Sequence, residues 1–308
     1  MSIPVILGPT AVGKTDLLLW LSEKYPIEVI SLDSRQVYKY MDIGTAKPTM
    51  EERERLPHHL VDICEPDSEF DVYRFRQLAL AAERDVLSRD KIPVFAGGSG
   101  LYADSILKGL VKNLPRNDTV RAALRTLEEE NPGFMKQLLS RVDPVASGRI
   151  HPNDLKRMQR YLEAFFISGR QLSSMQREET ISERFTVILV DRKRDELHSR
   201  IGQRVDKMRC LGLVKEVQKL LVMGFGCGLN AMKTIGYAEI CDLLAGSKKA
   251  DETFELIKRN TRRFARRQMI WFRRYKNSSR LNLSTMERSS IEKAFAGLFD
   301  SFWGDYRG

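Results

Sequence analysis

A glycine-rich segment near the start of the chain has the residue types and spacing of a phosphate-binding loop. It consists of Gly8, Pro9, Thr10, Ala11, Val12, Gly13, Lys14 and Thr15, and it matches the pattern G-x-x-x-x-G-K-[ST] in full. The glycines let backbone N–H groups converge on phosphate oxygens, the lysine adds a positive charge, and the final hydroxyl can hold Mg²⁺. An ordinary glycine turn explains a full match poorly, so we expect this segment to bind phosphate groups.

An acidic residue follows the second apolar segment of the chain. Asp33 directly follows the apolar residues 27–32, so it should lie at the edge where open α/β sheets place their ligands. Asp33 could cap a following helix, and taken alone this role is as well supported as a chemical one. A carboxylate beside a phosphate site can hold a metal or accept a proton from an attacking group. Its polar neighbours Ser34, Arg35 and Gln36 could meet a substrate.

A second glycine turn and an arginine pair add weaker signals. Gly97-Gly98-Ser99-Gly100 follows the apolar residues 92–96, and would bring Ser99 to the same edge as the first loop, although a tight turn is the simpler explanation. Arg200 and Arg204 lie four apart, so on a helix they share a face and could close over a pyrophosphate. A solvated basic face explains that spacing more simply.

Positive charge is concentrated near the carboxyl end of the chain. The chain has 51 basic and 41 acidic residues, and a single segment without Asp or Glu accounts for the whole net charge of +10. Its ten basic residues are Lys258, Arg259, Arg262, Arg263, Arg266, Arg267, Arg273, Arg274, Lys276 and Arg280. Phe264, Trp271, Phe272 and Tyr275 are interleaved with them and could pack inward. Helical spacing of the arginines predicts a stripe that tracks a nucleic-acid backbone, which we favour over a solvated charge run.

The elements that position these residues alternate along the first part of the chain. Short apolar segments at 3–7, 27–32 and 92–96 predict buried strands, and helical patterns follow at 15–25 and 101–108. This alternation is typical of a parallel sheet flanked by helices. The patterns at 120–130, 133–139 and 153–168 predict helices, one further strand is expected at 185–190, and the remainder reads as mainly helical.

Length and composition bound the class of protein. At 308 residues the chain can hold one large domain with an insertion, or two domains. The scattered cysteines Cys64, Cys210, Cys227 and Cys241 form no metal or C-x-x-C pattern, so free thiols in a reducing cytoplasm are expected, and the histidines read as structural or solvent-facing. No apolar run approaches the roughly 20 residues that cross a bilayer, and no membrane partner is expected.

The order of these motifs resembles the bacterial tRNA dimethylallyltransferases, also called tRNA isopentenyltransferases. The resemblance spans nearly the whole chain and rests on the phosphate loop and on six further blocks, of which the block 33–48 is far more specific than the loop. The other blocks are residues 97–102, 149–154, 165–169, 235–237 and 266–273. Ser99 stands where Thr is common in the family, which keeps the hydroxyl. The carboxyl-terminal zinc finger of eukaryotic relatives is absent from this sequence.

The resemblance implies a chemistry for the loop and its neighbours. It implies transfer of a dimethylallyl group from dimethylallyl diphosphate to N6 of adenosine 37, next to the anticodon, in tRNAs that read codons beginning with U. Asp33 becomes the general base, with Thr15 and Ser99 as hydroxyl partners in the catalytic site. Arg204 joins the phosphate loop as a diphosphate contact, and Thr15 becomes the Mg²⁺ ligand.

The resemblance also implies an interface with the tRNA anticodon stem-loop. The residues that correspond to tRNA contacts are Asp33, Ser34, Arg35, Gln36, Ser99, Arg121, Lys156, Arg157, Met158, Gln159, Arg160, Lys233, Thr234, Ile235, Gly236, Tyr237, Ala238, Arg266, Arg267, Gln268 and Arg273. Part of this set lies in the basic segment found from charge alone. A monomer in the cytoplasm is expected.

We therefore predict an α/β fold with a P-loop NTPase-like parallel sheet. The catalytic core is expected at 1–115 and 185–308, with a basic helical carboxyl-terminal region, and an all-helical insertion that contacts tRNA is expected at 116–184. A nucleotide kinase that uses Asp191 for magnesium, or an isopentenyltransferase acting on free adenine nucleotides, needs no basic stripe. An RNA-binding ATPase or scaffold explains the stripe but leaves Asp33 without a role.

Overall fold

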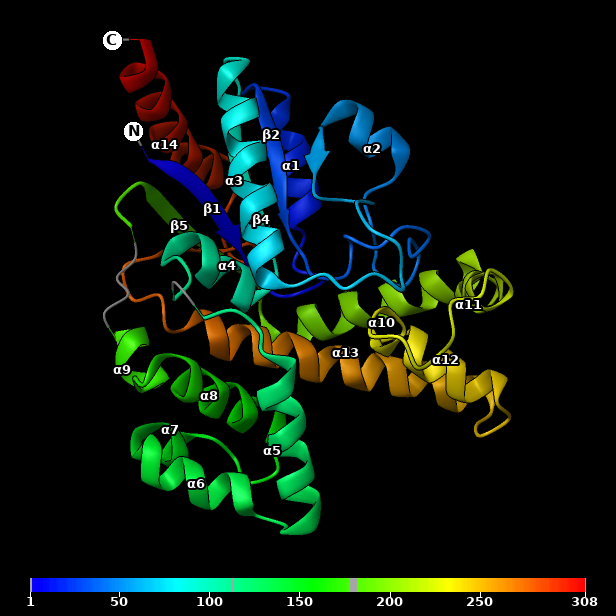
Figure 1. The fold of residues 1–308 in the computed structure, drawn as a ribbon. Coiled ribbons are helices and arrows are strands. Elements are labelled where there is room, and N and C mark those ends of the chain that lie inside the picture. Colours follow the sequence, from blue (N-terminus) through cyan, green and yellow to red (C-terminus); the bar gives the residue numbers. More distant parts are fainter. Residues whose placement is uncertain (1, 112–113, 178–181, 308) are drawn as a thin grey trace. The chain divides into compact units, whose positions relative to one another are not determined.

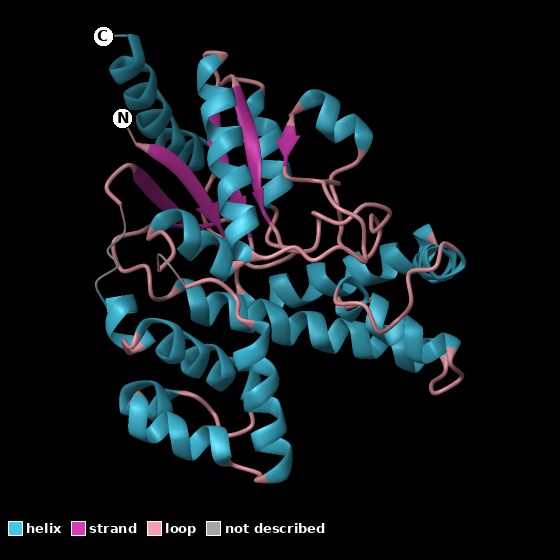
Figure 2. Ribbon diagram, in the orientation of Figure 1, coloured by secondary structure: helices cyan, strands magenta, loops and turns pink. Residues whose placement is uncertain are grey.

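Buried strands form the centre of the larger of two units in this computed structural model, which describes residues 2–111, 114–177 and 182–307. The larger unit comprises Met1–Ile106 and Glu183–Gly308, and the smaller one comprises Leu107–Ser182. The strands are β1 (Ile3–Leu7), β2 (Ile27–Leu32), β3 (His58–His59), β4 (Ile92–Gly97), β5 (Phe185–Asp191) and β6 (Ser279–Asn282). Figure 2 shows them in magenta within the larger unit.

All neighbouring strands pair in parallel, in the order β3-β2-β4-β1-β5-β6. The predicted α/β class with a parallel sheet is confirmed, and so are the central strands, whose residues are buried on both faces. The sequence analysis missed the edge strands β3 and β6. Both are short, and in β6 only Leu281 is buried, so neither carries a hydrophobic pattern of its own.

Helices of the larger unit flank the sheet and cross the end to which its strands point (Figure 1). In chain order they are α1 (Lys14–Ser22), α2 (Met50–Arg55), α3 (Val72–Ser88), α4 (Gly100–Leu107), α10 (Arg194–Leu211), α11 (Leu213–Val222), the 3₁₀ turn η1 (Ala231–Lys233), α12 (Tyr237–Leu244), α13 (Ala250–Phe272) and α14 (Arg288–Arg307). The helices α10 and α13 lie side by side. Local signals set several starts: Thr49 and Glu52 form a capping box for α2, and the Asp71 side chain caps α3.

The smaller unit contains helices and no strand in its described residues. Its helices are α5 (Asp118–Glu130), α6 (Phe134–Val142), α7 (Pro144–Arg149), α8 (Leu155–Ser168) and α9 (Leu172–Arg177). Leu124, Leu139 and Leu162 form the centre of its core. The insertion was expected at 116–184, whereas the smaller unit begins at Leu107 and ends at Ser182; residues 178–181 lie outside the described residues. Across the described ranges, no helix combines the length and the apolar content needed to cross a membrane.

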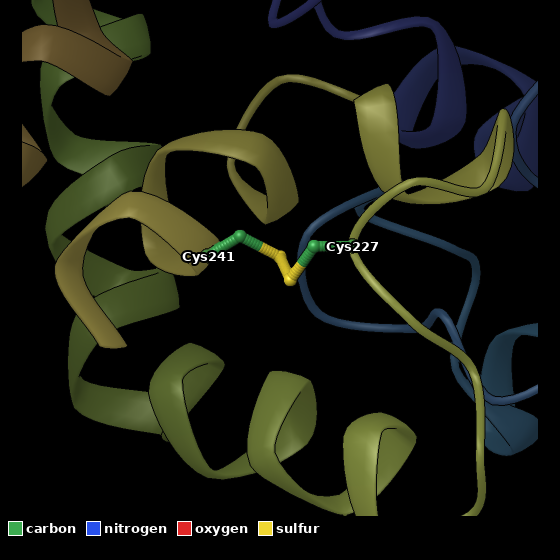
Figure 3. The surroundings of a disulfide bond; sticks show 2 residues. All are labelled: Cys227 and Cys241. Atoms are coloured by element: carbon green, nitrogen blue, oxygen red, sulfur yellow. A yellow bond between two sulfur atoms is a disulfide. The ribbon is translucent and has the colours of Figure 1, made fainter. Parts of the chain in front are cut away.

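The expectation of free thiols throughout is wrong for one pair of cysteines. Cys227 and Cys241 form a disulfide across a sequence separation of 14, with their Cα atoms 6.1 Å apart, whereas Cys64 and Cys210 are free. Figure 3 shows the bond joining the loop that carries Cys227 to a helix. That helix is α12, so the disulfide links it to the segment before η1. No local spacing pattern announces such a pair, because tertiary folding brings the two residues together.

We predict that Cys227→Ser lowers the stability of the protein. In the chain-entropy account a loop of this length contributes about 3 kcal/mol to the free energy of unfolding. Denaturant unfolding of the oxidised protein and of the variant measures the difference, with Cys210→Ser as the control because Cys210 is an exposed free thiol. Equal midpoints for Cys227→Ser and the oxidised parent would contradict a stabilising disulfide.

Candidate active site

A cavity of about 570 Å³ opens at the carboxyl ends of β1, β2 and β4. Its walls come from the loops after these strands, from α10, from the segment after η1 and from α13. Of the residues singled out in the sequence, the lining includes Thr10, Ala11, Val12, Gly13, Lys14, Thr15, Asp33, Ser34, Arg35, Gln36, Ser99, Arg204, Lys233, Thr234, Ile235, Arg267 and Gln268. Residues that lie far apart in the chain therefore share one cavity.

The phosphate loop joins β1 to α1, as its pattern requires. Gly13 has a φ of 102°, which a residue with a side chain rarely adopts, and α1 begins at the next residue. A Cβ on Gly8 would lie 2.5 Å from the carbonyl oxygen of Val190, so only glycine allows this close approach to β5. The ammonium of Lys14 donates hydrogen bonds to the carbonyls of Gly8 and Pro9, at 2.8 and 2.9 Å. These contacts curl the lysine over the loop.

Three arginines hold the outer side of the phosphate loop. The guanidinium of Arg192 donates to the carbonyl of Val12 at 2.7 Å, and that of Arg200 donates to the carbonyl of Ala11 at 2.9 Å. Arg204 donates to the hydroxyl of Thr10 at 3.4 Å and lines the cavity. The interpretation of Arg200 and Arg204 as a solvated basic face is therefore wrong. Both contact the loop, and Arg204 adds positive charge where a diphosphate would lie.

The buried environment of Lys14 lowers the pKa of its amine. Burial lowers the pKa of Lys14 to about 7, Arg204 acts in the same direction, and Asp33 partly opposes them. Burial and the nearby guanidinium of Arg204 together outweigh the carboxylate of Asp33 and disfavour the charged amine. A bound phosphate group would remove this penalty.

Asp33 caps a turn of the backbone and lines the cavity. Its Oδ1 accepts hydrogen bonds from the backbone N–H groups of Arg35 and Gln36, at 2.8 and 3.3 Å. These bonds cap a turn and not a helix, because the next helix begins at Met50. Both engage Oδ1 and neither engages Oδ2, and Asp33 lines the cavity. The turn thus orients the carboxylate while using only one of its two oxygens.

The glycine turn after β4 is a close-packed junction. A Cβ on Gly97 would lie 2.3 Å from the carbonyl oxygen of Leu32, and a Cβ on Gly100 would lie 2.4 Å from the ring of Trp271. The backbone N–H of Ser99 donates to the carbonyl of Leu32 at 2.9 Å. Ser99 consequently lines the same cavity as Asp33 and the phosphate loop. The glycine turn, a weak signal in the sequence, is thus part of the site, because β2 and α13 both pack against it.

Gln268 bridges two loops of the site. Its Oε1 accepts from the backbone N–H of Thr10 at 2.9 Å, and its Nε2 donates to the carbonyl of Gly98 at 2.9 Å. The residue is buried, and its amide is already engaged by the backbone. The sequence analysis expected Gln268 to contact tRNA; in the structure its amide holds the phosphate loop against the turn after β4.

The other expected tRNA contacts differ in how far their side chains are exposed. Met158 is fully buried in the core of the smaller unit, and Tyr237 is fully buried in the larger one. For these two side chains a direct contact is wrong. Arg121 and Arg160 pair with the buried carboxylate of Glu163, at 2.8 and 2.6 Å. Gly236 is buried as well, whereas Lys156, Arg157 and Lys233 are exposed, and Gln159 and Ala238 are half-buried.

The cavity also contains residues that the sequence analysis did not assign to it. Thr45, His58 and Trp271 line it. The Nδ1 atom of His58 lies 2.7 Å from the carbonyl oxygen of Leu56, and burial lowers the pKa of this histidine, which favours the neutral ring. Thr45 belongs to the specific block 33–48, so that block was the available signal. His58 had none, because its strand is only two residues long.

The donor set fits magnesium in the manner of a phosphate loop. The described residues contain no cluster of three or more His, Cys, Asp or Glu side chains that could form a protein cage for a metal. Thr15 and Asp33 both line the cavity and supply one hydroxyl and one carboxylate. Mg²⁺ commonly takes only one or two protein ligands and completes its shell with substrate phosphates and water. These residues therefore suit an ion that arrives with a diphosphate.

Asp191, the magnesium ligand of the kinase alternative, lies elsewhere. It lines a separate, smaller cavity of about 180 Å³ together with Arg273 and Arg280. Its Oδ1 accepts from the backbone N–H of Arg192 at 2.7 Å. It is not among the residues that line the larger cavity, which weighs against a kinase arrangement.

The basic segment divides into paired and unpaired residues. Lys258 pairs with Asp206 at 2.8 Å and with Glu255 at 2.9 Å, and Arg274 pairs with Asp104 while its guanidinium lies 4.1 Å from the Trp271 ring. Arg263, Arg266 and Arg267 are exposed on α13 and have no ion-pair partner in the part of the chain that the structure describes. Of these, Arg267 reaches the cavity. Phe272 and Tyr275 are buried, in line with the inward packing that the sequence analysis considered. Helix α13 ends at Phe272, so Arg273 lies just beyond the helix.

Comparison with known proteins places the site in a family. The model of the IPP transferase family matches residues 36–275, and that of the isopentenyl transferase family matches residues 1–65. A tRNA dimethylallyltransferase of Kosmotoga olearia is 53% identical over 99% of both chains, and one of Thermotoga maritima is 50% identical over 95% of this chain and 96% of its own.

Solved structures give the same result. A tRNA isopentenylpyrophosphate transferase from Bacillus halodurans is 32% identical, with a TM-score of 0.73 over 99% of this chain and 98% of its own. A eukaryotic dimethylallyltransferase described as acting on tRNA is 28% identical, with a TM-score of 0.84 over 99% of this chain and 80% of its own.

We predict that diphosphate binding is linked to proton uptake by Lys14. Above a pKa of about 7 the free amine is neutral, and an anion beside it raises the pKa again, so the affinity should fall by up to about tenfold per pH unit above 7. Calorimetry in buffers of different ionisation enthalpy measures the uptake. Lys14→Arg is the control because arginine keeps the charge without titrating. Equal proton uptake at pH 8 in the two proteins would contradict the assignment.

Proposed function

Because this chain belongs to the IPP transferase family, we infer that it transfers a dimethylallyl group to N6 of adenosine 37 in tRNA. The proposed donor is dimethylallyl diphosphate, and the products are N6-(dimethylallyl)adenosine and diphosphate. The proposed acceptors are tRNAs that read codons beginning with U. One observation carries the chemistry: a phosphate loop and a separately oriented carboxylate line the same cavity.

The donor binds through its diphosphate. Gly13, Lys14 and Thr15 line the cavity, so their backbone N–H groups and the positive end of α1 can face the phosphate oxygens, and Lys14 and Arg204 supply charge. The phosphates leave in this reaction, so these cations stabilise the charge that grows on the leaving group. Thr15 would hold Mg²⁺, which supplies further neutralisation of that charge when bound.

The acceptor enters with its amine directed at the allylic carbon. A bond forms from N6 to that carbon while the carbon–oxygen bond to the diphosphate breaks, and the N6 proton passes to Oδ2 of Asp33. Ser99 stands in the same cavity and can hydrogen-bond the base. Adenine must leave the stack of the anticodon loop to reach such a site, as bases do in other enzymes that modify them.

The tRNA backbone is proposed to follow the unpaired arginines of α13. Arg263, Arg266 and Arg267 offer positive charge without a competing carboxylate among the described residues. Lys233 adds an exposed cation at the cavity. From the smaller unit, Lys156 and Arg157 are exposed and remain proposed contacts. We also propose that the protein acts as a monomer in the cytoplasm.

A direct assay separates this function from its rivals. The protein is incubated with unmodified tRNA and dimethylallyl diphosphate, and in parallel with ATP or with free adenine nucleotides in place of tRNA. Diphosphate release that depends on tRNA, with a prenylated nucleoside found by mass spectrometry, supports the proposal. ATP turnover supports a kinase or an RNA-binding ATPase, and prenylation of free nucleotides supports the small-molecule transferase.

We predict that Asp33→Asn reduces transfer by roughly 10²–10⁴-fold, the range that general base catalysis contributes. The amide oxygen can still accept the two backbone hydrogen bonds of the turn, so folding and tRNA binding should be retained. Single-turnover kinetics and a tRNA binding measurement check this, with Asp33→Ala as the variant that also removes the cap. Near-normal turnover of both variants would refute Asp33 as the base.

We predict that Arg266→Ala weakens binding of all acceptor tRNAs to a similar extent. Loss of one phosphate contact should reduce the slope of log K against log salt by about 0.7–0.9. Binding titrations over a range of salt concentrations measure the slope. Lys91→Ala is the matched control, because Lys91 is an exposed cation before β4, at the opposite ends of the strands. An unchanged slope for Arg266→Ala would remove α13 from the interface.

A further inference from the structure

The segment Met41–Pro48 belongs to the specific block 33–48, and the mechanism gives this segment no task. In the structure it is a loop without regular secondary structure between β2 and α2. Its residues Gly44, Thr45, Ala46 and Pro48 line the cavity. This loop therefore forms a wall of the active site, and the contacts behind it determine where that wall stands.

A carboxylate from α11 binds the back of this wall. Oε2 of Glu216 accepts hydrogen bonds from the backbone N–H groups of Asp42 and Ile43, at 3.0 and 2.9 Å, and Oε1 accepts from that of Gly44 at 3.2 Å. Three consecutive N–H groups that converge on one anion hold the backbone in a single conformation. Hydrogen bonds to a charged acceptor are stronger than those between neutral groups.

Tyr237, the first residue of α12, also contacts Glu216, and we call these two residues the joint. Its hydroxyl donates to Oε1 of Glu216 at 2.6 Å. Its ring lies against Gly44, where a Cβ would be 2.3 Å from the ring atom Cε2, so glycine is required at that position. Burial, and then the charge of Glu216, raise the pKa of Tyr237 well above its usual value, which keeps the hydroxyl protonated as a donor.

The same joint reaches a second wall of the cavity. Tyr237 begins α12 directly after the segment Lys233–Gly236, of which Lys233, Thr234 and Ile235 line the cavity. A second bond joins the chain segments that precede the two walls, because the guanidinium of Arg35 donates to the carbonyl of Asn230 at 3.0 Å. Glu216 and Tyr237 thus set the distance between the loop 42–46 and the segment 233–235.

Separate contacts hold the other side of the loop. The buried ammonium of Lys47 donates to the carbonyl of Tyr38 at 2.9 Å and to Asp42 at 2.6 Å. Nε2 of Gln36 donates to the carbonyl of Ala46 at 3.3 Å. Loss of Glu216 or Tyr237 should therefore shift the wall without unfolding the loop.

We propose that Glu216 and Tyr237 are positioning residues that fix these two walls for the acceptor base. The inference rests on the proposed function, because it treats the cavity as the adenine site. None of the hydrogen bonds of Glu216 and Tyr237 involves residues 8–15. Their effect should fall on tRNA and not on the diphosphate.

The test compares Tyr237→Phe and Glu216→Gln with two matched controls. Tyr73→Phe removes a hydroxyl from a tyrosine that is 61% exposed, and Glu54→Gln neutralises an exposed glutamate. Each positioning variant should raise the KM and the Kd for tRNA by about tenfold, the factor for loss of one charge-assisted hydrogen bond, with the donor KM changed by less than about twofold. The double variant should lose no more than about the larger single effect, because the two residues act as one unit.

A size exchange provides the second measurement. Gly44→Ala alone should weaken tRNA binding, because its Cβ collides with the Tyr237 ring, and Gly44→Ala with Tyr237→Leu should recover part of that loss. A merely stabilising role would lower the melting temperature without this split between the two substrates. The proposal is overturned if Tyr237→Phe and Glu216→Gln bind tRNA like the controls, or if Gly44→Ala is harmless.

Direct binding also separates this proposal from the proposed function. The Kd values are measured with an unmodified anticodon stem-loop and need no turnover. If the parent protein fails to prenylate tRNA, the proposed function fails, while the binding comparison among the variants still decides whether the joint positions the acceptor.

Discussion

The parallel register of three strands is the constraint on which the active site depends. Leu7 pairs with Gly97, and Gly97 pairs with Leu32, so one row of the sheet crosses β1, β4 and β2 at their carboxyl ends. The residues that follow this row begin the phosphate loop, the glycine turn and the turn capped by Asp33. Hydrogen bonds of a parallel ladder hold each of these chain segments about 5 Å from its neighbour in the sheet. Backbone pairing in the sheet therefore positions the three loops of the site, independently of their side chains.

The glycines at this edge are required by proximity. Gly8 approaches β5, Gly97 approaches β2, and Gly100 receives the ring of Trp271, so any Cβ would force the loops apart. Gln268 then joins the phosphate loop to the glycine turn through its amide. Because α13 contributes Gln268 and Trp271, the helix that carries the exposed arginines is also part of the catalytic wall. Substrate charge and catalytic geometry are therefore linked through a single rigid element.

Charge in the cavity is unbalanced in a way that suits its substrate. Lys14 and Arg204 face the same space, and burial disfavours their charged forms, which is why the pKa of both is lowered. Such a site is completed by an anion, and a diphosphate brings several negative oxygens at once. The opposite arrangement holds for Glu216, whose charge is satisfied by backbone N–H groups and by Tyr237. The charges of Lys14 and Arg204 are thus available to a ligand, whereas the charge of Glu216 holds the loop 42–46 in place.

The sequence by itself determined the parallel α/β class, the phosphate loop, Asp33 at a strand end and the uncompensated arginines, because each depends on residues close together in the chain. It could not distinguish Met158 and Tyr237 from exposed contacts, or foresee that His58 lines the cavity and that the amide of Gln268 joins the phosphate loop to the turn after β4. Nor could it pair Cys227 with Cys241, or find the edge strands β3 and β6. Those features arise where separate segments pack, and burial there depends on neighbours that no local pattern specifies. Tertiary structure alone decided which polar side chains face the substrate and which hold the walls in place.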